Sequence, residues 1–164
     1  MANSKMFQNI FITVLLIGSV TVTSAVAADS VPPKPSKMDK CPVCGMFVYK
    51  YPDWTAEIVF EDGGVFFFDG AKDFFKFYFN LKMYHPHKTY KDIAATYVTE
   101  YYDVKLINAQ DAFYVIGSDI YGPMGRELIP FESEADAREF MKDHKGKRVL
   151  KFKNIKSSVI DKLD

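Results

Sequence analysis

The sequence predicts an α+β fold of two similar ββα-type units with mainly antiparallel sheet. Short apolar stretches with alternating polarity are separated by glycine-containing turns, and each pair of them is followed by one stretch with helical spacing. Strand pairs followed by single helices are typical of α+β proteins, in which neighbouring strands run antiparallel. With 15 Phe and 10 Tyr, the core is expected to be unusually aromatic.

The first unit is predicted over residues of about 41–95. Alternation over residues 55–60 predicts a strand, Asp62-Gly63-Gly64 predicts a hairpin turn, and residues 65–68 form the returning strand. Asp69 is expected to cap a helix over about residues 70–81. Apolar residues near helical spacing give this helix a core-facing stripe, which consists of Ala71, Phe74, Phe75, Tyr78 and Phe79.

The second unit is predicted over residues of about 96–156. Strands are expected at residues 112–117 and 126–131, with a loop over Ser118–Gly125 between them. A capping box formed by Ser133 and Asp136 opens a helix that runs to about residue 144, and a further strand follows at residues 148–152.

The two predicted units match weakly at their strand-to-helix junctions. In each, an aromatic residue is followed by an acidic one, then by an Asp and a Phe in the helix. An acidic residue at such a junction interacts favourably with the helix dipole. The matched residues are Phe68, Asp69, Asp73 and Phe77 in the first unit and Phe131, Glu132, Asp136 and Phe140 in the second.

The N-terminus predicts export. Lys5 precedes an apolar run over residues 10–22, and Ala25-Val26-Ala27 fits a signal-peptidase site, which favours a cleaved signal peptide of residues 1–27 over an uncleaved membrane helix. No cysteine follows the apolar run, so a lipid anchor is not expected. Residues 28–40 contain three prolines and are predicted to be a flexible tether, followed by one domain over residues 41–164.

Charge and residue pattern exclude some functions. Without residues 1–27 the chain has 20 basic and 21 acidic residues, because only Lys5 is removed, and this balance gives no electrostatic basis for nucleic-acid binding. There is no Ser/His/Asp set with supporting spacing and no phosphate-binding loop. An enzyme is therefore not predicted.

Cys41-Pro-Val-Cys44-Gly-Met46 is the strongest chemical motif. Thiolate and thioether ligands select Cu(I) over harder cations, and a thioether cannot be lost to a disulfide. Gly45 allows the backbone to turn so that the sulfur atoms on either side converge. The motif predicts a soft-metal site, most simply for Cu(I).

The same motif also fits zinc binding, thiol chemistry or no chemistry at all. A structural zinc site needs a second ligand pair, for which only histidines such as His85 and His87 are available, and these are more often solvated. Cys-x-x-Cys is also the spacing of thiol–disulfide oxidoreductases, although that chemistry favours the start of a helix, whereas here strand pattern follows. A third alternative is a non-catalytic binding module with incidental cysteines.

Met124 lies in the second motif, Gly122-Pro-Met124-Gly125. An apolar side chain between glycines in a loop is either buried beneath the loop or displayed for use. If the two units pack face to face, Met124 brings a third sulfur to the first motif. Asp69 and Asp73 are interpreted as a helix cap and a first-turn residue rather than as ligands.

The chain resembles the NosL family, the accessory proteins of nitrous-oxide reductase maturation. The resemblance covers residues 41 to about 153, nearly all of the predicted mature body. It rests on Cys44-Gly45-Met46, Phe68-Asp69-Gly70, Tyr97-Val98, Tyr101, Tyr102, Ile107-Asn108-Ala109, Pro123-Met124-Gly125, Phe131, Ala137 and Phe140.

The resemblance implies a periplasmic Cu(I)-binding chaperone that helps to deliver copper to the reductase. It implies Cys44, Met46 and Met124 as copper ligands, with Cys41 as a possible helper. Many family members are lipoproteins, and the lipidation cysteine expected of those members is missing here. Residues 41–48 also resemble the opening of heavy-metal-binding domains of the YHS and TRASH type, but the later cysteine pair of those domains is missing.

Overall fold

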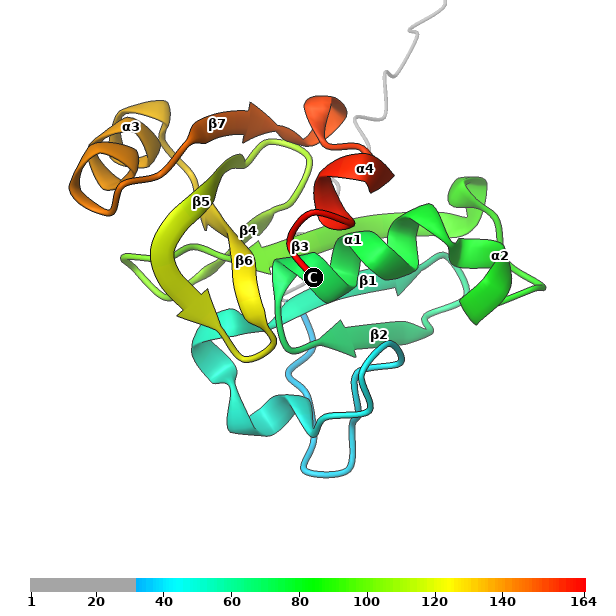
Figure 1. Ribbon diagram of the computed structural model, residues 1–164. Helices are drawn as coiled ribbons and strands as arrows, with labels where there is room; N and C mark the ends of the chain where they lie inside the picture. Colours follow the sequence, from blue (N-terminus) through cyan, green and yellow to red (C-terminus); the bar gives the residue numbers. More distant parts are fainter. Residues whose placement is uncertain (1–31) are drawn as a thin grey trace, which may run out of the picture. The chain divides into compact units, whose positions relative to one another are not determined.

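The computed structural model describes residues 32–164. The predicted signal peptide and the first residues of the predicted tether lie outside this part. Among the described residues, no helix has both the length and the apolar character needed to cross a membrane. The described residues form one compact unit, shown in Figure 1.

The first sheet has four antiparallel strands in the order β2-β1-β3-β4. They are β1 (Ala56–Phe60), β2 (Val65–Phe68), β3 (Ile93–Thr99) and β4 (Leu106–Asn108). The predicted hairpin of β1 and β2 is confirmed, with Ala56 opposite Phe68 and Val59 opposite Val65. Ala56, Ile58 and Phe60 are buried on one face of the sheet because side chains alternate along a strand.

Helix α1 (Ala71–Phe79) packs on the first sheet, and its aromatic stripe explains why. Phe74, Phe75 and Phe77 are fully buried, and Phe68 of β2 packs edge-on to Phe74 and Phe77 with ring centroids 5.8 and 5.2 Å apart. Edge-to-face pairs of this kind contribute about 0.5–1.5 kcal/mol beyond the burial of apolar area. The short helix α2 (Leu81–Tyr84) and the 3-10 turn η3 (Tyr90–Asp92) lead from α1 to β3.

The second sheet has three antiparallel strands in the order β6-β5-β7. They are β5 (Phe113–Gly122), β6 (Gly125–Phe131) and β7 (Arg148–Lys151), and helix α3 (Glu134–Asp143) lies between β6 and β7 in the chain. The predicted N-cap of α3 is confirmed, because Ser133 Oγ accepts hydrogen bonds from the amides of Ala135 (3.0 Å) and Asp136 (3.4 Å). The chain ends with the 3-10 turn η4 (Phe152–Asn154) and the short helix α4 (Ser157–Ile160).

Two local predictions were wrong. The predicted loop over residues 118–125 is mostly strand: β5 continues to Gly122, with a register shift between Ile116 and Tyr121, and only a tight turn separates Gly122 from Gly125. Gly117 has a φ of +77°, which lets the strand bend and then continue. The apolar stretch after Met46 forms the 3-10 turns η1 (Val48–Lys50) and η2 (Pro52–Trp54) rather than a strand.

The two sheets repeat one arrangement, which confirms the α+β fold of two similar ββα-type units. In each, two hairpin strands lead into a helix, and the next strand pairs with the first of the hairpin strands. The predicted boundary near residue 95 lies inside β3, which pairs with β1, so the first sheet extends to Asn108 and the second begins at Phe113.

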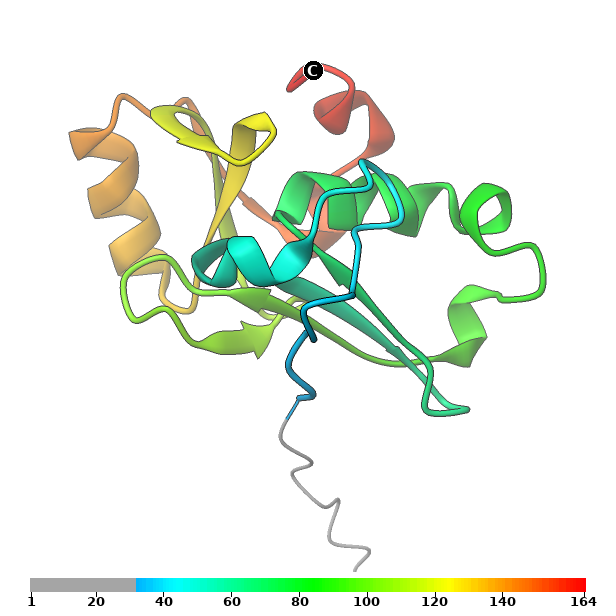
Figure 2. The same ribbon diagram turned by 90° about the horizontal axis from the view of Figure 1, so that it is seen from below.

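The second sheet is buried on both faces. Tyr114, Leu128 and Leu150 join the core around α1, whereas Val115, Ile129 and Phe131 pack with α3. In Figures 1 and 2 the second sheet accordingly lies between α1 and α3. Contact between the units is direct, since the rings of Phe75 and Tyr114 meet edge-on with centroids 5.3 Å apart.

Candidate metal centre

The two cysteines lie on a tight loop over residues 41–46. The amide of Cys41 donates to the carbonyl of Met46 (2.8 Å), and the amide of Gly45 donates to the carbonyl of Cys41 (2.9 Å). Gly45 has a φ of +77°, a left-handed conformation that favours glycine, as the turn at this position was expected to require. The loop therefore holds both thiols and the Met46 backbone in one small region.

Two carboxylates complete a buried cluster with these thiols. One ligand atom from each of Cys41, Cys44, Asp69 and Asp73 lies within 4.8 Å of all the others. Cys44 Sγ donates to Asp69 Oδ1 (3.1 Å), and Cys41 Sγ donates to Asp73 Oδ2 (3.3 Å). The second oxygen of Asp69 is buried and has no hydrogen-bond partner among residues 32–164, so this side chain retains capacity for a further interaction.

The predicted capping role of Asp69 is wrong. The N-cap of α1 is Gly70, which provides no side-chain cap, and the carboxylate of Asp69 accepts from Cys44 instead. Asp73 does lie in the first turn of α1, as predicted, but it faces Cys41. The sequence alone carries no signal that these two aspartates contact the cysteines, because the partners are 25 or more residues apart along the chain.

The surroundings of the thiols keep them protonated. The pKa of Cys44 is raised from its ordinary value of 9.0 to about 12, mainly by burial and also by the hydrogen bonds with the Asp73 and Asp69 side chains. Burial is also the main cause that raises the pKa of Cys41, and the charge of Asp73 raises it further. A metal ion that binds these cysteines as thiolates must therefore displace the thiol protons. Rapid disulfide exchange requires lowered thiol pKa values instead.

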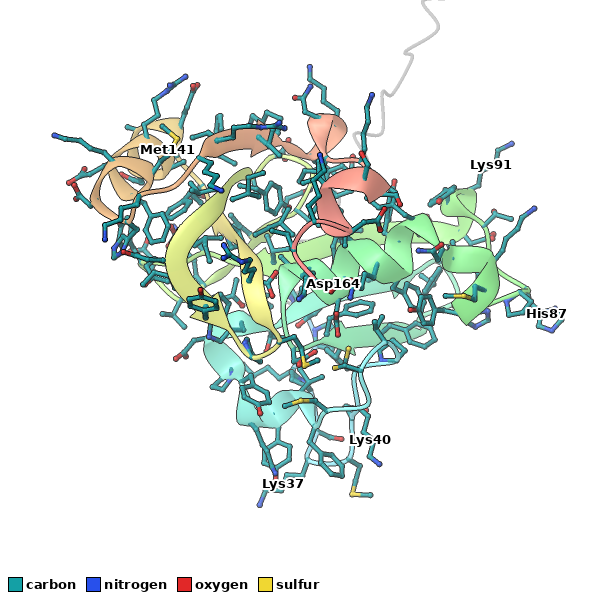
Figure 3. The ribbon with its side chains drawn as sticks, in the orientation of Figure 1. Lys37, Lys40, His87, Lys91, Met141 and Asp164 are labelled. Carbon is teal, nitrogen blue, oxygen red and sulfur yellow. The ribbon has the colours of Figure 1, made fainter. Side chains whose placement is uncertain are left out.

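The hairpin that joins β5 to β6 ends beside this cluster. Lys72, the residue before Asp73, donates from Nζ to the carbonyl oxygen of Met124 (2.8 Å). In Figure 3 several sulfur atoms, drawn in yellow, lie where the hairpin end, the start of α1 and the loop of residues 41–46 meet. Met46 is half-buried, and Met124 is 40% exposed.

A buried glutamate attaches the hairpin to α1. Glu127 Oε1 accepts from the amides of Lys72 (2.5 Å) and Leu128 (2.9 Å). The fit is close at Gly70, where an added Cβ would lie 2.4 Å from Glu127 Oε2. Burial raises the pKa of Glu127 from 4.5 to about 8, so the side chain is mostly neutral at pH 7 and acts as an uncharged acceptor.

The histidines considered as zinc ligands do not belong to the cluster. His85 packs against the rings of Phe60 and Phe66, with centroids 6.1 and 5.6 Å away. His87 is exposed and lies beyond α2, far from the hairpin end in Figure 3. The only group of three or more Cys, His, Asp or Glu side chains with metal-binding spacing among the described residues is the one around Cys44.

Comparison with known proteins decides the family. The NosL family model matches residues 32–160, most of the chain. The chain belongs to the NosL family. Among relatives, the "Copper-binding lipoprotein NosL" of Stutzerimonas stutzeri is 30% identical over 129 residues, which cover 74% of this chain and 64% of that protein.

Solved NosL structures share the fold. A crystal structure of the copper chaperone NosL from Shewanella denitrificans aligns with a TM-score of 0.66 at 23% identity, covering 78% of this chain and 97% of that one. A solution structure of the apo-NosL protein from Achromobacter cycloclastes has a TM-score of 0.45 at 26% identity, covering 64% and 87%. The crystal structure confirms that the α+β arrangement is that of NosL proteins.

Proposed function

We propose that this chain is an exported Cu(I)-binding metallochaperone that delivers copper for the maturation of nitrous-oxide reductase or a related periplasmic cuproenzyme. Membership of the NosL family supports the copper-binding part, because the relatives are described as a copper chaperone and a copper-binding lipoprotein. The observation that carries the proposal is the meeting of the cysteine loop, the start of α1 and the Met124 hairpin.

The proposed ligands are Cys44, Met46 and Met124, with Cys41 as a helper. All four offer soft sulfur, which prefers Cu(I) to hard cations. Their exposure differs in a useful way: Cys41 is 1% exposed, Cys44 and Met46 are half-buried, and Met124 reaches the surface. Metal transfer by ligand exchange needs donors that a partner's ligands can approach, which favours the outer three over Cys41.

The carboxylates have a supporting role in this proposal. Asp69 and Asp73 accept hydrogen bonds from the two thiols and so fix where the sulfur atoms lie before metal arrives. Each thiol that loses its proton adds one negative charge beside the carboxylates, and one bound Cu(I) neutralises one such charge. The proposed activity is metal binding and transfer, with no bond made or broken in an organic substrate.

Copper binding is tested by competition with a Cu(I)-specific chelator. The protein is expected to take up one Cu(I), and Cys44→Ser combined with Met46→Ala is expected to remove this competition. Met124→Ala should weaken it, whereas Met83→Ala, which removes a methionine that is 66% exposed on α2, should leave it unchanged. Unchanged binding in the Cys44 and Met46 double variant would overturn the proposed site.

Export and delivery are tested separately. Cleavage after Ala27 predicts a periplasmic protein whose N-terminal residue is Ala28, which intact-mass measurement detects. Delivery predicts that the copper-loaded protein, mixed with metal-free nitrous-oxide reductase and its assembly proteins, loses copper while the reductase gains activity. Equal activation by the Met124→Ala and wild-type proteins at limiting copper would contradict a role for Met124 in transfer.

A further inference from the structure

A second hollow, separate from the cysteine cluster, is surrounded by positive charge. It has a volume of about 580 Å³ and lies between the second sheet and the C-terminal segment that contains α4. Among the residues that the structure describes, no acidic side chain lines it. Five of the side chains that line it are basic, namely Arg126, Lys147, Arg148, Lys156 and Lys162. The copper proposal gives these residues no role.

This concentration of charge does not follow from composition. Residues 32–164 contain 20 basic and 20 acidic residues, because Lys5 and Asp29 are the only charged residues before them. Elsewhere in this part of the chain, six of the other fifteen lysine and arginine side chains pair with a carboxylate, among them Lys76 with Asp164 (2.6 Å) and Lys105 with Glu132 (2.6 Å). By contrast, none of the five basic side chains around the hollow forms an ion pair with another described residue.

The fold brings these cations together from separate segments. Arg126 lies on β6, Arg148 begins β7, and Lys156 and Lys162 lie on either side of α4. Like charges that line one hollow repel one another, and an anion bound among them would offset this repulsion.

Lys147 is held in place by the backbone of β5. Its amide donates to the carbonyl of Ile116 (2.8 Å), and its aliphatic stem lies across Gly117. A Cβ at Gly117 would come within 2.8 Å of Lys147 Cγ, and the φ of +77° there also favours glycine. The bend in β5 thus makes room for one of the five cations.

The geometry points to a binding site for a multiply charged, phosphate-bearing anion. The two guanidinium groups provide planar forks that match phosphate oxygens, and the three ammonium groups add charge. Asn154 and Ser158 also line the hollow and provide uncharged hydrogen-bond donors. The volume of the hollow is within the range of small-molecule sites, and it is larger than one inorganic phosphate needs. A free phosphate compound and a phospholipid headgroup share this chemistry.

The site is tested with pyrophosphate, titrated into the metal-free full-length protein at about 0.15 M salt, where diffuse surface attraction is largely screened. Saturable binding is expected, and Arg148→Gln combined with Lys156→Gln should weaken it about tenfold or more. Lys82→Gln combined with Lys91→Gln is the matched control, because it removes two exposed lysines outside the hollow and changes the net charge equally. No saturation, or equal weakening by both pairs, would overturn the proposal.

Vesicles distinguish the two sources of phosphate. Co-flotation with phosphatidylglycerol vesicles that the Arg148 and Lys156 substitutions abolish, and that pyrophosphate competes away, would identify a lipid headgroup. Pyrophosphate binding without co-flotation would identify a free anion. Saturable binding of an acidic polypeptide but not of pyrophosphate would overturn the site in favour of protein docking. None of these measurements involves copper, so their failure is distinguishable from failure of the copper proposal.

Discussion

At the scale of single residues, buried carboxylates determine much of the chemistry. Asp69, Asp73, Glu57 and Glu127 are each no more than 3% exposed. Removing a carboxylate from water is costly unless it gains a hydrogen bond or a proton. Asp69 and Asp73 accept from thiols, whereas burial raises the pKa of Glu57 and of Glu127.

Substitution of Asp73 tests its effect on the thiols. Asp73→Asn is expected to lower the pKa of Cys44 in the metal-free protein, because it removes a negative charge and a hydrogen bond that oppose formation of the thiolate. Each pKa unit lost should raise the thiolate fraction near neutral pH about tenfold and the rate of Cys44 alkylation about threefold, because a less basic thiolate is a weaker nucleophile. The matched control is Asp136→Asn, at the corresponding position of α3 in the second unit. Equal rates in the wild-type and Asp73→Asn proteins would contradict this effect.

Glu57 gives a pH dependence of folding stability. It lies on β1, and neither carboxylate oxygen has a hydrogen-bond partner among residues 32–164. Burial raises its pKa from 4.5 to about 7. Between these values the folded state holds a proton that the unfolded state has released, so the free energy of unfolding falls as pH rises from about 4.5 to about 7.

Glu57→Gln is therefore expected to stabilise the protein above pH 7 by about 2 kcal/mol and to change little near pH 4.5. Urea denaturation at both pH values measures this difference. Glu127 contributes with the same sign around pH 8, so the slope should decrease without vanishing. Glu61→Gln, at an exposed position just after β1, is the control, and an identical pH profile for wild type and Glu57→Gln would count against the assignment.

At the scale of elements, the β5–β6 hairpin and α1 are fixed to each other by Glu127 and Lys72. Glu127 accepts from the backbone at the start of α1, and Lys72 returns a hydrogen bond to the hairpin end. Lys72 also donates to the carbonyl of Leu163 (3.4 Å), so the C-terminal segment joins the same contact. The position of Met124 therefore depends on residues that are not themselves metal ligands.

Glu127→Ala is expected to lower the free energy of unfolding by about 2–3 kcal/mol, because it leaves buried amides without an acceptor. Glu127→Gln keeps an uncharged acceptor and should cost less than about 1 kcal/mol. Urea denaturation measures both, and competition for Cu(I) should weaken only in the Ala variant. The exposed Glu132→Ala serves as a control. Equal stability of the Ala and Gln variants would show that the acceptor is not needed.

Sequence patterns predicted which helices and strands form better than they predicted the residues at which those elements begin and end. The alternation in β1 and the Ser133 cap are local features, and both were predicted correctly. The stripe of α1 was predicted in part, because Phe74 and Phe75 are buried as expected but the fully buried Phe77 was missed. The length of β5 was not, because a glycine in a turn-like stretch can also be a bend within a strand. The stretch after Met46 was mistaken for strand because its apolar residues pack the core from 3-10 turns.

At the scale of the whole molecule, one core connects both units. Phe75 of α1 contacts Tyr114 of β5 and also Phe152 of η4, with centroids 5.3 and 5.1 Å apart. Trp54 packs against Tyr101, which in turn contacts Phe140 of α3. Trp54, a residue of the first unit, thus packs against the apolar residues around α3. These contacts predict that the two units unfold together.

Phe75→Ala is expected to cost about 3–5 kcal/mol through the cavity it leaves. Trp54 fluorescence reports on the apolar residues around α3, and far-UV circular dichroism reports on all of the secondary structure. Both signals should keep a single shared midpoint in the variant, shifted to lower urea. A Trp54 transition that stayed at its wild-type midpoint while the dichroism shifted would show that the units unfold independently.

The site was only partly predictable from the sequence, because some of its residues meet only when separate segments of the chain pack together. The sulfur motif is contiguous, so the sequence alone nominated Cys41, Cys44 and Met46, and the structure places the two cysteines in the cluster. Asp69 and Asp73 approach the thiols only because the loop of residues 41–46 packs on the start of α1. The prediction that Met124 joins the site was made on condition that the units pack together. The second sheet does pack against α1, and the ligand role of Met124 stays a prediction.

The separation of the sulfur donors along the chain also sets an order of events. Residues 41–46 and the hairpin of residues 122–125 meet only after both sheets have formed, with Lys72 linked to Met124 and Leu163. An unfolded chain in transit across a membrane has no such meeting point. Under the proposed export and copper binding, copper loading follows translocation and folding, so the ion comes from the compartment in which the protein works and not from the one in which it is made.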